Sequence, residues 1–203
     1  SSQEIGIAAA LSGDEKLMAD YRIEAYIEFA KRIGLAPPDA TKKTHPAVRD
    51  GMKAPFLAIG YGAGAALIAS RTGRTTAQAE WLLQEHRRTY PRLWAWLDTV
   101  VDHGALRGFL ETTLGWNLAT NNETNPGTLK NYLMQANGAE MMRLAIHDLH
   151  AAGITVVAPV HDALFGQPER HVEPLVLADG RGRLHAGRGL PRAPPALEPH
   201  LPD

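Results

Sequence analysis

The amino-acid sequence predicts an α+β fold that is mainly helical and contains a small antiparallel sheet. Most of the chain from residue 12 to residue 153 places apolar residues at helical spacing, with glycine or proline near the expected helix ends. Residues 154–166 are instead rich in β-branched side chains, which is typical of a strand, a turn and the start of a return strand. Beyond residue 179, glycine, proline and arginine dominate without any period, so we expect residues 167–203 to form an irregular, disordered tail.

Three helices are expected in the first part of the chain. Ser12 or Asp14 begins a short helix, because either side chain can cap a helix start. Residues 22–34 have helical spacing and end at a glycine, and a proline-rich loop then leads into a long helix from about residue 46 to residue 70. This long helix contains Pro55, which removes a backbone hydrogen bond at a cost of about 3 kcal/mol. We therefore expect a kink between residues 51 and 55.

The second part of the chain is expected to hold a helical pair, a hairpin and a further long helix. The pair covers residues 75–104 and is broken at Pro91. Residues 106–120 (LRGFLETTLGWNLAT) predict a short hairpin, and residues 127–153 predict a helix that ends at a glycine.

Composition excludes several classes of protein. Hydrophobic residues make up 44% of the chain and charged residues 21%, which is ordinary for a soluble globular domain. No apolar run is long enough to span a membrane, and no signal segment opens the chain. The absence of cysteine excludes disulfides and thiolate metal sites and favours a cytoplasmic location. A net charge of −1 means that any binding to nucleic acid depends on a local basic patch.

A stripe of four residues at a step of four stands out in the long helix: Arg49, Lys53, Leu57 and Tyr61. A step of four advances about 400° around a helix, so these side chains lie on one slanting line. Charged runs usually form a solvated helix face. However, the two cations precede the apolar stretch, and their spacing suits a polyphosphate, since arginine offers a planar fork and lysine a point charge.

Two further groups have polar side chains in apolar surroundings. Asp162, next to His161, lies at the expected turn after a buried strand, where a carboxylate either caps its own backbone or binds a divalent cation. Asn131 and Gln135 are four apart on one helix, where they are either satisfied core amides or donors to the groove of a duplex.

Taken in order, these segments resemble DNA polymerase family A, the DNA polymerase I family. The pattern R-x3-K-x7-Y-G in residues 49–62 resembles the family's motif B, and VHDAL (160–164) resembles motif C. Residues 1–14 (SSQEIGIAAALSGD) resemble motif A just past its metal-binding aspartate. Their sequence is similar to that of a proteobacterial and phage-type branch of the family. The resemblance covers about residues 1–166 and implies the fingers and part of the palm of a template-directed DNA polymerase.

The resemblance implies a role in nucleotide binding for five residues. Arg49 and Lys53 would hold the triphosphate. Lys53 would also lie near the proton that the leaving pyrophosphate takes up. Leu57 would pack against the incoming base, although many members have an aromatic residue there. Tyr61 would sit beside the templating base, and Glu4 would crowd the ribose 2′ position and so exclude ribonucleotides.

The resemblance also implies DNA and metal contacts. Asn131, Gln135 and His161 would contact the primer–template, and Asp162 would ligate Mg²⁺ in a two-metal site. The expected partners are primer–template DNA and deoxynucleoside triphosphates, with no membrane and no oligomer.

Several departures bear on activity. The motif A aspartate would lie two positions before Ser1, so the chain is expected to be a fragment that is inactive alone. Ala163 stands where many relatives carry a second carboxylate, and Pro55 is unusual in motif B. A shift of reading frame between about residues 164 and 180 would explain the tail. The alternatives are a catalytically dead nucleic-acid-binding remnant, a single-subunit RNA polymerase, against which Glu4 argues, and a helical interaction domain with accidental motif matches.

Overall fold

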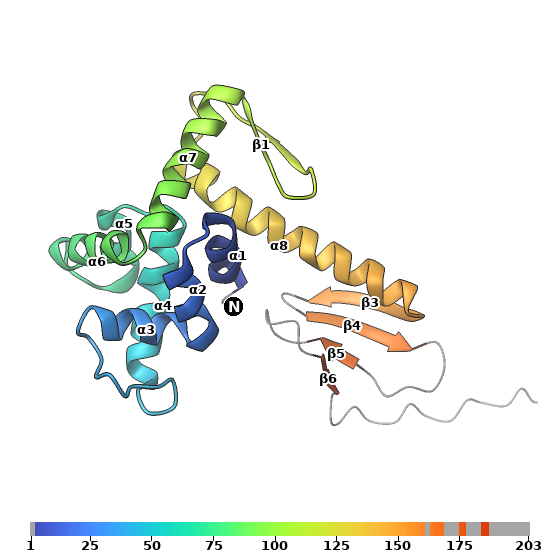
Figure 1. Cartoon of the computed structure of the whole chain (residues 1–203), viewed down its shortest axis with the longest axis horizontal. Coiled ribbons are helices and arrows are strands. Elements are labelled where there is room, and N and C mark those ends of the chain that lie inside the picture. Colours follow the sequence, from blue (N-terminus) through green and yellow to red (C-terminus); the bar gives the residue numbers. More distant parts are fainter. Residues whose placement is uncertain (1–2, 161–162, 169–174, 178–183, 187–203) are drawn as a thin grey trace, which may run out of the picture. The chain divides into compact units, whose positions relative to one another are not determined.

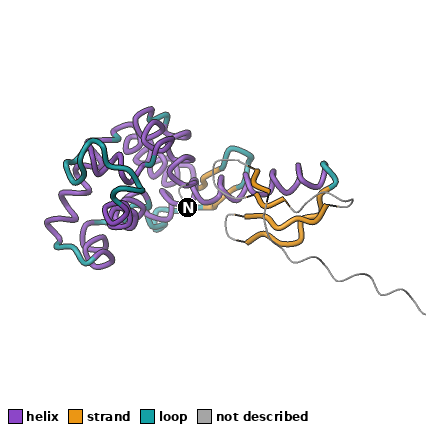
Figure 2. The backbone as a smooth tube through the Cα atoms, turned by 90° about the horizontal axis from the view of Figure 1, so that it is seen from below, coloured by secondary structure: helices purple, strands orange, loops and turns teal. Residues whose placement is uncertain are grey.

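The computed structural model describes residues 3–160, 163–168, 175–177 and 184–186. The chain divides into two units, Ser1–Leu144 and Ala145–Asp203 (Figure 1). Helices form most of the described part of the first unit, which also holds loops and a short hairpin, whereas strands form most of the described part of the second (Figure 2). The mainly helical α+β fold predicted from the sequence is confirmed, with two small antiparallel sheets.

The first unit begins with three short helices, α1 (Gln3–Ser12), α2 (Glu15–Ile23) and α3 (Ala25–Arg32). Asp14 caps α2, as predicted, because its Oδ1 accepts a hydrogen bond of 3.0 Å from the Leu17 amide. Glu24 ends α2 and begins α3, so the helix predicted over residues 22–34 is in fact divided at this residue.

The helix predicted from residue 46 to residue 70 is wrong as a single element. It consists of α4 (Pro46–Gly60) and α5 (Ala65–Thr72), and α4 continues through Pro55. The break falls at Gly62, which has a φ of +81°. A glycine in this conformation is a usual helix end, and a Cβ at this position would also lie 3.3 Å from the Cα of Gly127, so the approach of a distant segment further favours glycine here.

The remaining helices of the first unit agree with the prediction. Helix α6 (Thr76–Thr89) begins with a capping box between Thr75 and Gln78, and α7 (Pro91–Arg107) begins with a proline. Strands β1 (Phe109–Glu111) and β2 (Asn117–Ala119) pair as the expected hairpin, and α8 (Pro126–Ala151) follows. None of the described helices is long and apolar enough to cross a membrane.

An aromatic cluster forms the centre of the first unit. Phe29, Phe56, His86 and Tyr90 are buried and pack largely edge to face, with the centres of the Phe56 and His86 rings 4.7 Å apart. Such contacts between ring edges and faces are favourable beyond the area that they bury. This cluster joins α3, α4, α6 and the start of α7, and so fixes the helix that carries the stripe.

The second unit contains one antiparallel sheet in the order β3-β4-β5-β6. Strands β3 (Ile154–Val160) and β4 (Ala163–Pro168) form the predicted strand and return strand, and the turn between them lies outside the described residues. The end of β4 (Gln167 and Pro168) and strands β5 (Leu175–Leu177) and β6 (Leu184–Ala186) fall where the sequence predicted an irregular tail, which is a correction for these eight residues. These residues form strands because their backbone groups pair with a neighbouring strand, and composition alone does not indicate such pairing. The rest of the predicted tail lies outside the described residues.

Candidate functional site

Helix α4 carries the stripe on the edge of its buried face. Met52, Phe56 and Ile59 are buried toward the core, whereas Arg49, Lys53 and Leu57 are half-buried. Tyr61, also half-buried, caps the helix at its end. The four residues of the stripe therefore lie beside the core and remain in contact with solvent.

The two cations of the stripe differ in what they already bind. The Arg49 guanidinium donates to Glu24 Oε1 at 3.1 Å and to Asp50 Oδ1 at 3.2 Å, and it lies 5.4 Å from the centre of the Tyr26 ring. Lys53 makes no ion pair with any residue that the structure describes. An anion at this helix thus meets a lysine whose charge is available and an arginine that has to exchange partners.

At the far end of the stripe, Tyr61 meets two other sequence-predicted residues. Gln135 Nε2 on α8 donates to the Tyr61 hydroxyl oxygen at 3.5 Å. Burial, followed by the charge of the Glu4 carboxylate and a hydrogen bond to it, raises the pKa of Tyr61 to about 12. Glu4 Oε2 is buried and has no hydrogen-bond partner among the described residues. Tyr61 is therefore a neutral phenol at physiological pH that links α1, α4 and α8.

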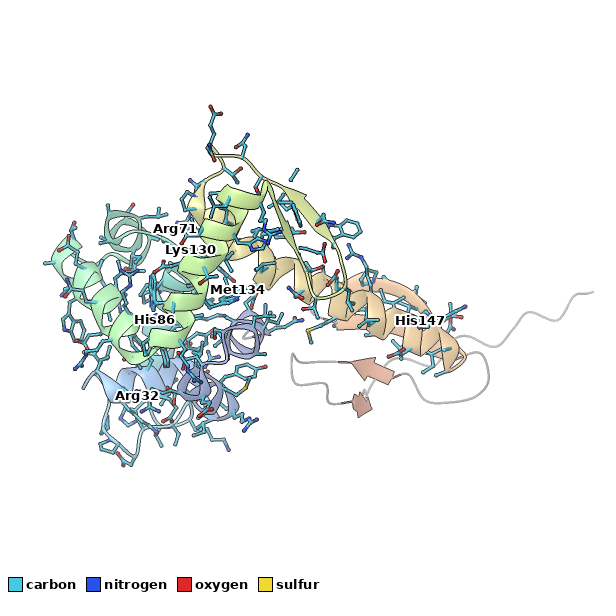
Figure 3. All side chains as sticks on the ribbon, turned by 45° about the horizontal axis from the view of Figure 1, so that its top comes forward. Arg32, Arg71, His86, Lys130, Met134 and His147 are labelled. Atoms are coloured by element: carbon cyan, nitrogen blue, oxygen red, sulfur yellow. The ribbon has the colours of Figure 1, made fainter. Side chains whose placement is uncertain are left out.

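A small cavity lies beside Tyr61. Its walls include Glu4, Leu57, Tyr61, His86 and Met134, and it holds about 20 Å³ of space, enough for one water-sized molecule. Figure 3 labels His86 and Met134. The walls are almost entirely apolar apart from the Glu4 and His86 side chains. The structure thus brings Glu4, Leu57 and Tyr61 to one cavity, together with His86 and Met134.

His86 is a site-wall residue that sequence reasoning missed. It is fully buried, and its Nδ1 accepts a hydrogen bond of 3.1 Å from Trp94 Nε1. Burial lowers the pKa of His86 to about 3, so the ring is neutral and carries its proton on Nε2. Nε2 has no hydrogen-bond partner among the described residues. A lone histidine in a helical segment gives no sequence signal of this role.

The remaining residues that the sequence predicted for the site do not line this cavity, or lie outside the described residues. Asn131 lies on α8 one turn before Gln135, and its Oδ1 is buried without a described hydrogen-bond partner. His161 and Asp162 lie outside the described residues. Elsewhere, no described group of three or more His, Cys, Asp or Glu residues is arranged to hold a metal ion.

A second polar cluster, which the sequence did not indicate, fixes the hairpin to α8. Glu140, which is buried, accepts hydrogen bonds from Thr112 Oγ1 at 2.5 Å and from the Leu114 amide at 3.3 Å. Asn137 Oδ1 accepts from the Thr113 amide at 3.1 Å. The segment TTLGW is therefore the hairpin tip, and two side chains of α8 satisfy its backbone and hydroxyl groups.

Comparison with known proteins gives one consistent result. The family model described as DNA polymerase family A matches residues 1–176. The chain is 25% identical over 191 residues to DNA polymerase I of Chloroflexus aurantiacus, and the match covers 86% of the chain and 20% of that protein. It is 26% identical over 180 residues to the thermostable DNA polymerase I of Thermus filiformis, with coverage of 81% and 21%. The chain thus spans about a fifth of the length of these curated relatives.

A solved structure has the same fold. The POL domain of Pol1 from M. smegmatis, in complex with a DNA primer-template and a dNTP, matches with a TM-score of 0.71. The match covers 83% of this chain and 32% of that chain at 22% identity, so it bears on the fold alone.

Proposed function

The chain belongs to family A of the DNA polymerases, and from this premise we propose that residues 1–166 form the fingers and part of the palm of a template-directed DNA polymerase. The observation that carries the proposal is the arrangement of α4: an available lysine charge on one turn, and a neutral tyrosine held near Glu4 and Gln135 at its end. This arrangement suits a deoxynucleoside triphosphate laid along the helix.

The proposed reaction joins the primer to the incoming nucleotide. The primer 3′-hydroxyl loses its proton to solvent and its oxygen bonds to the α-phosphorus, while the bond from that phosphorus to the β-phosphate oxygen breaks and pyrophosphate leaves. Lys53 holds the transferring phosphates and is assigned the proton that pyrophosphate takes up. Arg49 joins it by exchanging Glu24 and Asp50 for phosphate oxygens, which a guanidinium binds in pairs.

The other end of α4 is assigned to the base and the sugar. Leu57 packs against the base and Tyr61 lies beside the templating base. Glu4, whose carboxylate hydrogen-bonds Tyr61, occupies the space that a ribose 2′-hydroxyl needs and so rejects ribonucleotides. This assignment favours a DNA polymerase over a single-subunit RNA polymerase.

The proposal extends to DNA and metal. Asn131, Gln135 and His161 are assigned to the primer–template near its end. Mg²⁺, with Asp162 as one proposed ligand of a two-metal site, would activate the 3′-hydroxyl and neutralise phosphate charge. The proposed location is the cytoplasm, and no oligomer is needed.

Nucleotide binding by α4 tests the proposal. Titration of the 203-residue chain with a fluorescent deoxynucleoside triphosphate, followed by anisotropy, measures the dissociation constant. Lys53→Ala is expected to raise it about tenfold, because a charge-assisted contact to phosphate is lost. Duplex affinity, measured separately with a labelled primer–template, is expected to change little.

The matched control is Lys16→Ala, which removes an exposed lysine on α2 and should leave nucleotide affinity unchanged. Equal losses in both variants, or equal losses of nucleotide and duplex binding, would count against the assignment. Duplex binding without nucleotide binding would favour the nucleic-acid-binding remnant. A template-primed extension assay with Mg²⁺ and all four deoxynucleotides tests the expectation that the 203-residue chain alone is inactive.

A further inference from the structure

Pro55 leaves one backbone carbonyl of α4 without its usual partner. In a regular helix, the amide of residue 55 would donate to the carbonyl of Gly51, four residues earlier. Proline has no amide hydrogen, so this bond cannot form. Instead, Arg74 Nη2 donates to the Gly51 carbonyl oxygen at 2.9 Å.

The backbone on both sides of Arg74 is fixed. Gly73 ends α5 in the left-handed conformation, with a φ of +66°, and Thr75 begins α6 through its capping box. Arg74 is the single residue between these two caps, so its side chain starts from a defined position. A Cβ at residue 51 would lie 4.0 Å from Arg74 Nη2, an ordinary contact distance, so the guanidinium approaches the Gly51 carbonyl without a clash.

The missing hydrogen bond lies between the two halves of the stripe on α4. Arg49 and Lys53 precede Pro55, whereas Leu57 and Tyr61 follow it. Residue 51 is about 200° around the helix from residue 49, so the guanidinium reaches α4 from the face opposite the basic pair. Arg74 therefore contacts the helix without occupying the surface that Lys53 presents.

We propose that Arg74 is a positioning residue, which replaces the donor that Pro55 lacks and holds the two halves of α4 in one orientation. This inference rests on the proposed function, in which the first half binds the triphosphate and the second half meets the base and sugar. A helix that lacks one internal bond bends more readily at that point. The Arg74 contact keeps both halves on the same nucleotide.

A double-mutant cycle tests the inference in the full chain. Arg74→Met removes the donor and keeps the length of the side chain, whereas Pro55→Ala restores an amide that can donate to Gly51. In the Pro55 background, Arg74→Met should speed hydrogen exchange of the α4 amides after residue 55 and weaken nucleotide binding, each about fivefold, the effect of one net hydrogen bond. In the Pro55→Ala background, Arg74→Met should change neither quantity.

The matched control is Arg71→Met, because Arg71 is an exposed arginine at the end of α5 with no contact to Gly51 (Figure 3). Equal effects of Arg71→Met and Arg74→Met would assign the change to charge and overturn the inference. Equal effects of Arg74→Met in both backgrounds would also overturn it, as would faster exchange with unchanged nucleotide affinity. Hydrogen exchange is measured without nucleotide, so a chain that binds no nucleotide would refute the proposed function while the exchange data still decide the role of Arg74.

Discussion

His86 shows how a single residue can tie the fold to the candidate site. Its ring packs against Phe29, Phe56 and Tyr90, its Nδ1 accepts from Trp94, and it forms part of the cavity wall next to Glu4. A charged imidazolium could not remain in this apolar setting without a partner. The His86 ring is therefore neutral in the folded chain.

The burial of the neutral ring makes stability depend on pH. Burial lowers the pKa of His86 from 6.5 in the unfolded chain to about 3 in the folded one. The unfolded state therefore binds the extra proton as pH falls below 6.5, and the folded state does not. The stability contributed by the neutral ring is fully present above 6.5, and it is lost at about 1.4 kcal/mol per pH unit as pH falls toward the folded value.

Urea unfolding followed by tryptophan fluorescence, at several pH values within this window, checks the prediction. His86→Phe keeps an aromatic ring and should lose this part of the pH dependence. His147→Gln, a change at an exposed histidine, should keep it (Figure 3). The same slope in wild type and His86→Phe would show that His86 does not titrate in the unfolding transition.

At the scale of elements, the hairpin and α8 form one structural piece. Glu140 accepts two hydrogen bonds from the hairpin tip, and the Tyr132 hydroxyl donates to the Trp116 carbonyl at 2.9 Å. The Arg143 guanidinium lies 4.5 Å from the centre of the Trp116 ring. These contacts hold the TTLGW segment on the helix that carries Asn131 and Gln135.

Loss of the Glu140 carboxylate should therefore free the hairpin tip. Glu140→Ala leaves the Thr112 hydroxyl and the Leu114 amide without their acceptor, at an expected cost of about 1–3 kcal/mol in the free energy of unfolding. Hydrogen exchange of the amides from Thr112 to Trp116 should rise at the same time. Glu111→Ala, at an exposed position of the same hairpin, should do neither. Unchanged exchange at the tip in Glu140→Ala would mean that other contacts hold the hairpin.

The helix boundaries show what sequence patterns cannot predict. The cap at Asp14, the break at Pro91 and the end near Gly153 are local signals, and the structure agrees with each. The break at Gly62 coincides with a glycine in the left-handed conformation, which Gly127 also approaches closely. Helix α4 continues through Pro55, where Arg74 contacts Gly51. Both contacts join segments far apart in the sequence, so a local pattern could not predict them.

At the scale of the whole molecule, the order of the motifs predicted the family, but not how the site is built. Glu4 comes from α1, whereas Leu57 and Tyr61 come from α4. The resemblance assigns the three residues to one nucleotide, and in the structure they line one cavity. The sequence indicated no role for His86 or for Glu140. Their roles depend on burial and on distant partners, which are properties of the folded chain.

The division into two units leads to a prediction for the whole chain. Every residue of the described core clusters precedes Leu144, and so do all four tryptophans. A chain of residues 1–144 should therefore unfold in urea with nearly the same midpoint as the full chain when followed by tryptophan fluorescence. A clear fall in the midpoint would show that residues 145–203 stabilise the first unit.

The junction between α2 and α3 has a consequence for how this sequence can vary. Glu24 uses one carboxylate oxygen, Oε2, to cap α3 through the Ile27 amide, and the other, Oε1, to bind Arg49. Replacement of Arg49 removes one of these interactions, whereas replacement of Glu24 removes both at once. Among homologous chains that keep this junction, position 24 should thus accept fewer substitutions than its partner, even though it lies outside the segments that resemble motifs A, B and C.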